Sequence, residues 1–147
     1  MSKKARSEGN RVACAIKANK APFYISDVDL EDNVEDVVAC SVAVRKTLGK
    51  SQAGYMIISA GVTTLTVVVD LIDSSKLSAK DWLSFSLVGI SDSYSQEGNN
   101  ASFAKALITI DTPFKLKDIV RANAFAFLRS CSLLEDEESE EEYFTLD

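Results

Sequence analysis

The residues that could carry chemistry are few, because the 147-residue chain contains no histidine. Without an imidazole, the Ser-His-Asp and Cys-His arrangements of nucleophilic catalysis are excluded, and so is every imidazole metal site. The strongest acid–base candidate is Asp70, which follows a run of apolar residues and would have a raised pKa if it were buried. A small-residue turn nearby contains Ser59, Gly61 and Thr63, and its backbone amides could bind an anion. One hypothesis is therefore a small-molecule binder, or a histidine-free and metal-free enzyme, with a site near the 59–64 turn.

Two other segments resemble ligand-binding motifs and have simpler explanations. The alternating carboxylates of residues 27–32 lack the central glycine and the closing glutamate of a calcium loop. Asp32 is better explained as the N-cap of a following helix. Residues 48–51 end in Gly-Lys-Ser, but they follow a helix, whereas a Walker loop opens one. We expect no metal and no cofactor.

Basic residues suggest a nucleic-acid partner as an alternative. Residues 1–20 carry six bases, and the last predicted helix carries Lys115, Lys117 and Arg121. Such a set can bind a phosphate backbone through counterion release. No aromatic residues are interleaved with these bases as stacking platforms would require.

The acidic tail (residues 135–147) departs most from an ordinary domain. It contains eight acids and no base, so we expect it to be disordered. Ser139 has acids on both sides, which favours phosphorylation. Tyr143, Phe144 and Leu146 follow the acids, and this combination is typical of a docking segment in which charge steers encounter and rings supply burial.

Composition and cysteine usage indicate the compartment. The chain is 46% apolar and 26% charged, as in soluble globular proteins. No apolar run is long enough to cross a bilayer, so we expect no membrane insertion. Cys14, Cys40 and Cys131 each lie in an apolar pattern and are interpreted as buried, reduced thiols. The expected localisation is the cytoplasm, or the nucleus.

The pattern of elements predicts three regions: a flexible basic arm over residues 1–10, a single α+β domain over 11–134, and the acidic tail. Predicted strands cover 11–18, 22–26, 55–60, 65–71 and 103–110, with the proline in the second marking it as an edge strand. Predicted helices cover 33–48, 79–88 and 113–132.

The fold class is α+β, with a largely antiparallel sheet of about five strands and two long helices packed on it. The order ββαββ-short α-βα resembles the longin and profilin-like arrangement at the level of topology, which implies no function. We expect a small intracellular, non-catalytic interaction module, either an adaptor or a complex subunit. Its partner would be a protein, and homo-oligomers are compatible with the sequence.

Overall fold

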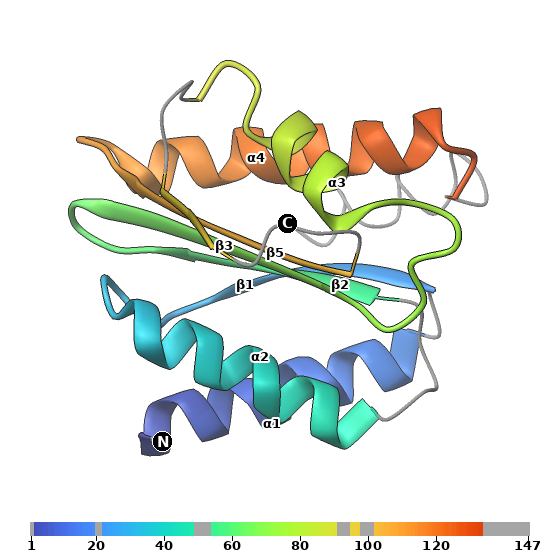
Figure 1. Cartoon of the computed structure of the whole chain (residues 1–147). Helices are drawn as coiled ribbons and strands as arrows, with labels where there is room; N and C mark the ends of the chain where they lie inside the picture. Colours follow the sequence, from blue (N-terminus) through green and yellow to red (C-terminus); the bar gives the residue numbers. More distant parts are fainter. Residues whose placement is uncertain (1, 20–21, 49–53, 91–94, 98–101, 134–147) are drawn as a thin grey trace.

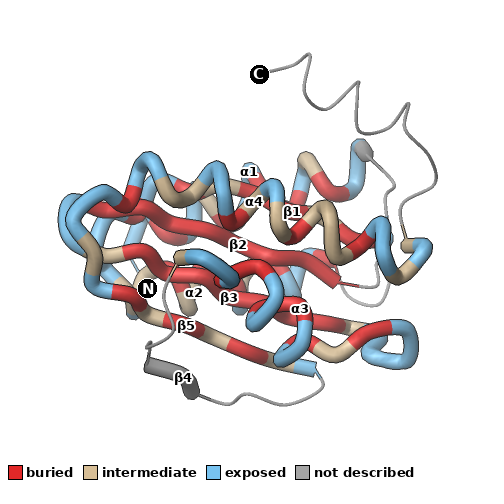
Figure 2. Tube along the Cα trace, turned by 90° about the horizontal axis from the view of Figure 1, so that it is seen from above, coloured by how far each residue is buried: buried red, intermediate tan, exposed pale blue. Residues whose placement is uncertain are grey.

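The two strands with the densest apolar sequence lie in the middle of the sheet. The computed structural model describes residues 2–19, 22–48, 54–90, 95–97 and 102–133. In it, β2 (Gly54–Ala60) pairs antiparallel with β3 (Thr64–Leu71), which confirms the predicted hairpin. Both strands are buried almost throughout, because helices cover both faces of the sheet (Figure 1, Figure 2). The hairpin is therefore the centre of the molecule.

The sheet is mixed, with strand order β1-β2-β3-β5-β4. β1 (Phe23–Val28) forms one edge, as its neighbouring proline predicted, and pairs parallel with β2. β5 (Phe103–Thr109) pairs antiparallel with β3, and the three-residue β4 (Ser95–Glu97) adds to its outer side. β1 and β2 pair in parallel because a helix crosses over between them.

In the part of the chain that the structure describes, four helices form the two outer layers, and the α+β class is confirmed. α1 (Lys3–Asn19) and α2 (Val34–Leu48) cover one face, where they bury Tyr55, Ile57 and Val68. α3 (Ala79–Ser86) and α4 (Pro113–Ser130) cover the other face, where Trp82 is buried against the strands (Figure 1). The predicted helices in residues 33–48, 79–88 and 113–132 are all present.

The predicted arm over 1–10 and the predicted strand over 11–18 are wrong, since one helix, α1, covers both. The alternation of Val12, Cys14 and Ile16 suggested a strand, but Cys14 is exposed. The residues that face α2 instead repeat at helical spacing: Ala5, Gly9, Val12, Ala13 and Ile16. The element order consequently begins with a helix, unlike the longin and profilin-like order, which begins with two strands.

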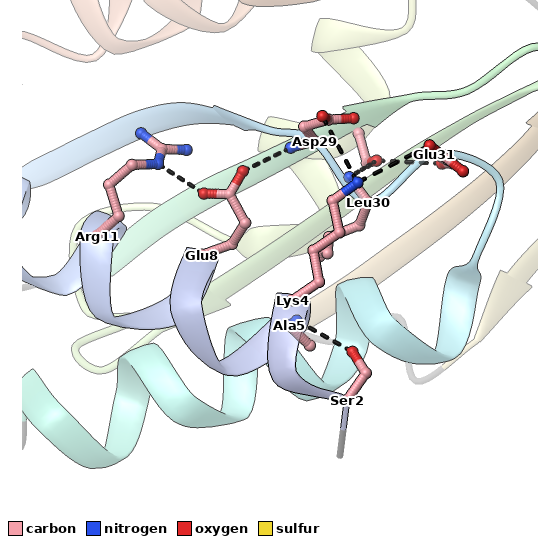
Figure 3. A network of polar contacts seen from close by, with 9 residues as sticks. Ser2, Lys4, Ala5, Glu8, Arg11, Asp29, Leu30 and Glu31 are labelled. Atoms are coloured by element: carbon pink, nitrogen blue, oxygen red, sulfur yellow. Dashed lines mark hydrogen bonds and ion pairs between the residues drawn. The ribbon is translucent and has the colours of Figure 1, made fainter.

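Polar contacts fix α1 to the segment that leads from β1 to α2 (Figure 3). The Glu8 carboxylate accepts a hydrogen bond from the Asp29 backbone amide at 2.9 Å and another from Arg11 at 2.6 Å. Lys4 Nζ lies 3.6 Å from Asp29 and 3.8 Å from Glu31. Lys4, which was expected to belong to a flexible basic arm, is thus paired with the first acids that follow β1.

The cysteines divide by environment. Cys40 is buried between α1 and α2, and burial raises the pKa of its thiol to about 11. Cys131 is partly buried and Cys14 is exposed, so the expectation of three buried thiols holds only for Cys40. Within the described residues, no helix combines the length and the apolar content needed to span a bilayer.

Candidate functional site

The acid–base candidate Asp70 belongs to a polar cluster beneath α2. Asp70 is buried on β3 and forms an ion pair with Arg45 from α2. The Tyr55 hydroxyl lies 3.1 Å from Asp70 Oδ2 and 2.7 Å from the Ser41 carbonyl oxygen. Burial raises the pKa of both Asp70 and Tyr55, while Arg45 opposes the shift at Asp70. The partners within the cluster satisfy these groups, so its arrangement is that of a brace between α2 and the hairpin.

The Asp70 carboxyl gives a pH prediction with a defined sign. Because its folded pKa lies above the ordinary value of 3.8, the native state binds this proton more tightly than the unfolded state does. Relative to Asp70→Asn, the wild type should therefore gain free energy of unfolding as pH falls through the raised pKa, with the gain complete below 3.8. Urea denaturation of both proteins between pH 8 and 4 measures this difference. If the stability difference instead fell as the pH was lowered, the ion pair with Arg45 would affect the pKa of Asp70 more than burial does.

The predicted anion-binding turn exists, but the chain supplies its own anion. Asp32 accepts hydrogen bonds from the backbone amides of Val62, Thr63 and Thr64 at 3.3, 3.2 and 3.0 Å, and from the Thr64 hydroxyl at 2.6 Å. The hydrogen bond from the Thr64 hydroxyl lowers the pKa of Asp32 most, and the three amides add to it. A Cβ at Gly61 would overlap Asp32 Oδ1, so the carboxylate fills the space that glycine leaves.

This arrangement corrects two interpretations. Asp32 was expected to cap α2, but Asn33 does so, since its Oδ1 accepts from the Asp36 amide at 3.1 Å. Ser59 is buried and donates to the Glu31 carbonyl oxygen at 3.2 Å. The structure also separates this turn from Asp70, which lies six residues along β3 from Thr64, about 20 Å away at an extended rise. Ser59, Gly61, Thr63 and Asp70 do not form one site.

The basic residues of α4 are not gathered on one outward face. Lys117 Nζ lies 3.4 Å from Asp27 Oδ2, and Arg121 approaches the same oxygen at 3.9 Å. Lys117 also lies 5.1 Å above the Phe114 ring, whereas Lys115 is exposed to solvent. Two of the three residues predicted to contact nucleic acid, Lys117 and Arg121, thus form ion pairs with Asp27 of the edge strand β1.

The remaining predicted sites fall outside the described residues. Ser139, Tyr143, Phe144 and Leu146 all belong to the acidic tail, which the structure does not describe. Phosphorylation and docking by this segment stay predictions. Within the described residues, no group of three His, Cys, Asp or Glu side chains is placed to hold a metal ion.

An apolar surface on α3 and α4 was not anticipated. We call it the α3–α4 patch: Phe85, Val88, Ile119 and Phe127. Phe85, Val88 and Ile119 are 41%, 64% and 46% exposed. The Phe85 and Phe127 rings contact across the two helices with centroids 5.2 Å apart. Large apolar side chains thus gather on one outer surface.

The backbone beneath the α3–α4 patch is held in place by hydrogen bonds between the helices. Asn123 Nδ2 donates to the carbonyl oxygens of Ser86 at 3.2 Å and Val88 at 3.1 Å. Ile119 precedes Asn123 by one turn, so it lies on the same side of α4 as the side chain that reaches Val88. Trp82 Nε1 donates to the Ala124 carbonyl oxygen at 3.1 Å and fixes α3 from the buried side.

The sequence did contain a signal for this patch. The apolar residues of α4 span an arc wider than one buried stripe, because Val120, Ala124 and Leu128 already fill the buried face. Ile119 and Phe127 lie at the edges of that arc. Phe85 lies near the end of α3, three residues after the buried Trp82, and Val88 follows the C-cap residue Leu87; both are exposed apolar residues beside the buried Trp82 and Leu83.

Comparisons with known proteins add little about function. No family model matches the chain, and no curated protein matches it. Among solved structures, the chain is similar to the C-Ala domain of alanyl-tRNA synthetase from Aquifex aeolicus, with 17% identity and a TM-score of 0.49. The match covers 69% of this chain and 86% of that domain. This likeness concerns the fold alone and carries no argument about activity or partners.

Proposed function

We propose that this protein is a non-catalytic protein–protein interaction module, an adaptor or complex subunit, whose partner binds the α3–α4 patch. The exposure of Phe85, Val88 and Ile119 on one surface carries the proposal. Single exposed apolar residues are ordinary on protein surfaces, whereas a contiguous group of large ones marks an interaction surface.

Two further properties of the patch support this proposal. Aromatic side chains are over-represented among residues that dominate binding energy, and Phe85 and Phe127 already contact each other in the unbound chain. The hydrogen bonds from Asn123 and Trp82 hold both helices in place, so little conformational entropy remains to be lost on binding. The partner is a protein that presents apolar side chains of its own.

Catalysis is disfavoured because the two candidate carboxylates already have bonding partners within the chain. Asp70 is paired with Arg45, and Asp32 is surrounded by the amides of its turn. Both carboxylates therefore stabilise the fold. The acidic tail with Tyr143, Phe144 and Leu146 remains, in this proposal, a second docking element.

The double variant Phe85→Ser/Ile119→Ser tests the proposal. Truncating an apolar anchor at an interface typically costs about 1–2 kcal/mol, so losing two should weaken binding by roughly thirtyfold to nearly a thousandfold. The measurement is affinity capture from extract with quantitative mass spectrometry, followed by titration of the purified partner. Phe85→Ser also removes the ring contact with Phe127, worth about 0.5–1.5 kcal/mol, so thermal unfolding must show that the variant is still folded at the temperature of the binding assay.

The matched control is Phe114→Ser/Val62→Ser, which removes one exposed phenylalanine and one exposed aliphatic residue elsewhere. The proposal requires that this control keeps the partner that the patch variant loses. Equal recovery by both double variants would refute the assigned surface. Sedimentation velocity on the same proteins reveals whether the partner is a second copy of this chain.

A further inference from the structure

One end of the molecule collects the C-terminal turns of three helices. α2 crosses over between the parallel strands β1 and β2, so it ends where β2 begins. α1 runs beside α2 in the same direction, with Gly9 against Ala43 and Lys4 near Glu31. α4 follows β5 and returns antiparallel to it, so it ends at the end of the sheet where β5 begins (Figure 1). β5 begins at Phe103, which pairs with Asp70.

This end carries a surplus of positive charge. The last turns hold Lys17 in α1 and Arg45 and Lys46 in α2. The two helix ends contribute about −1 charge and Asp70 one more, so a net charge of roughly +1 remains. Asp73 and Lys76 in the loop after β3 balance each other. We call this surface the basic end: Lys17, Arg45 and Lys46.

The basic end also has an exposed apolar neighbour. Val42 is 48% exposed and precedes Arg45 and Lys46 by three and four residues, so the three side chains lie together on α2. Lys17 and Lys46 are both exposed. A ligand that fits this surface combines several carboxylates with at least one apolar side chain.

We propose that the acidic tail of this chain docks on the basic end. The described chain stops at Leu133, just beyond the C-terminal turn of α4, so the tail starts at this same end of the sheet. Residues 134–147 can extend about 46 Å at roughly 3.3 Å per residue. The span from α4 across the sheet to α2 is on the order of 20 Å, given helix diameters of about 10 Å.

The composition of the tail matches the surface. Its carboxylates over residues 135–142 face Lys17, Arg45 and Lys46, and an aromatic ring from Tyr143 or Phe144 packs on Val42. The opposite end of the body is unfavourable for the tail, because it holds Asp29, Glu31, Asp32 and the first-turn acids of α2. This contact lies apart from the α3–α4 patch and does not depend on a partner there. A partner that binds the tail itself would have to displace the tail from the basic end.

Zero-length carbodiimide cross-linking of the full chain tests the docking. This chemistry joins a carboxylate directly to a lysine amine, and tryptic mapping of the separated monomer and dimer bands locates the links within one chain and between two. We expect tail carboxylates linked to Lys17 and Lys46 at least fivefold more often than to Lys4 or Lys115, the control lysines. The links should fall severalfold at about 0.5 M salt, where the Debye length is roughly 4 Å.

Internal controls keep the outcome interpretable. The Lys4–Glu31 pair, with 3.8 Å between its charged atoms, should cross-link in every sample and reports that the reaction worked. Val42→Ser should reduce the number of links to Lys46. The same substitution at an exposed valine of the β2–β3 turn, Val62→Ser, should not. Equal links to the control lysines, or no link at Lys17 and Lys46, would overturn the proposal. Links found only between two chains would overturn it in favour of a second copy.

Discussion

Trp82→Ala is expected to lower the free energy of unfolding by about 3–5 kcal/mol, the usual cost of deleting a fully buried large aromatic side chain. Trp82 is completely buried and packs edge-on against Phe23 of β1, with ring centroids 6.1 Å apart. Its indole donates to the Ala124 carbonyl oxygen, so the deletion leaves a cavity and removes a link between α3 and α4. Urea denaturation followed by far-ultraviolet circular dichroism measures the loss.

Trp82→Phe is the control for this result. It keeps an aromatic ring in the core and removes only part of the volume and the N–H, so the loss should be clearly smaller. If Trp82→Ala costs less than about 1 kcal/mol, Trp82 does not fill the core as described. Trp82 fixes α3 on α4. Trp82→Ala should therefore also lower the affinity for a partner that binds the Phe85–Phe127 pair, even under conditions in which the variant is still folded.

Gly9→Leu is expected to lower the free energy of unfolding by about 1–3 kcal/mol, the range for an overpacked contact. A Cβ at Gly9 would lie 2.9 Å from Ala43 Cβ and 3.3 Å from the Cys40 carbonyl oxygen, so α1 and α2 must move apart. The sign of this change in stability is informative, because the same glycine-to-leucine substitution at an exposed helical position stabilises a helix by almost 1 kcal/mol. Chemical denaturation of the wild type and Gly9→Leu measures the change in the free energy of unfolding.

Cys14→Leu supplies the comparison, because Cys14 lies on the exposed side of the same helix. Its stability should stay within about 0.5 kcal/mol of the wild type. If residues 1–10 formed a flexible arm, Gly9→Leu would be equally neutral. Unchanged stability in both variants would therefore contradict the packing of α1 on α2.

The parts of the fold that the sequence predicted correctly carry strong local signals. The β-branched run over residues 64–71 favours a strand wherever it lies. Glu35 and Asp36 at one end of α2, with Arg45 and Lys46 at the other, match the helix dipole without reference to any other element. Ser78 caps α3 through the Asp81 amide, as its spacing predicted.

α1 was misinterpreted because small residues give weak local signals. Ala5, Gly9 and Ala13 face α2 because only small side chains allow two helices to approach closely, and that requirement arises from the partner helix. Over five residues, Val12, Cys14 and Ile16 fit a strand as well as a helix. Only the contact with Ala43 and Cys40 distinguishes the two.

The candidate sites were decided by contacts between residues far apart in the chain. The sequence by itself determined the absence of imidazole chemistry, the α+β class, the central hairpin and the charge of the acidic tail, since these depend on composition and short-range pattern. The tertiary structure decided that Asp32 fills the turn at Thr63 and that Asp27 meets Lys117, pairs separated by tens of residues. Sequence spacing does not encode such pairs, because the folded sheet sets which charges lie close enough to interact.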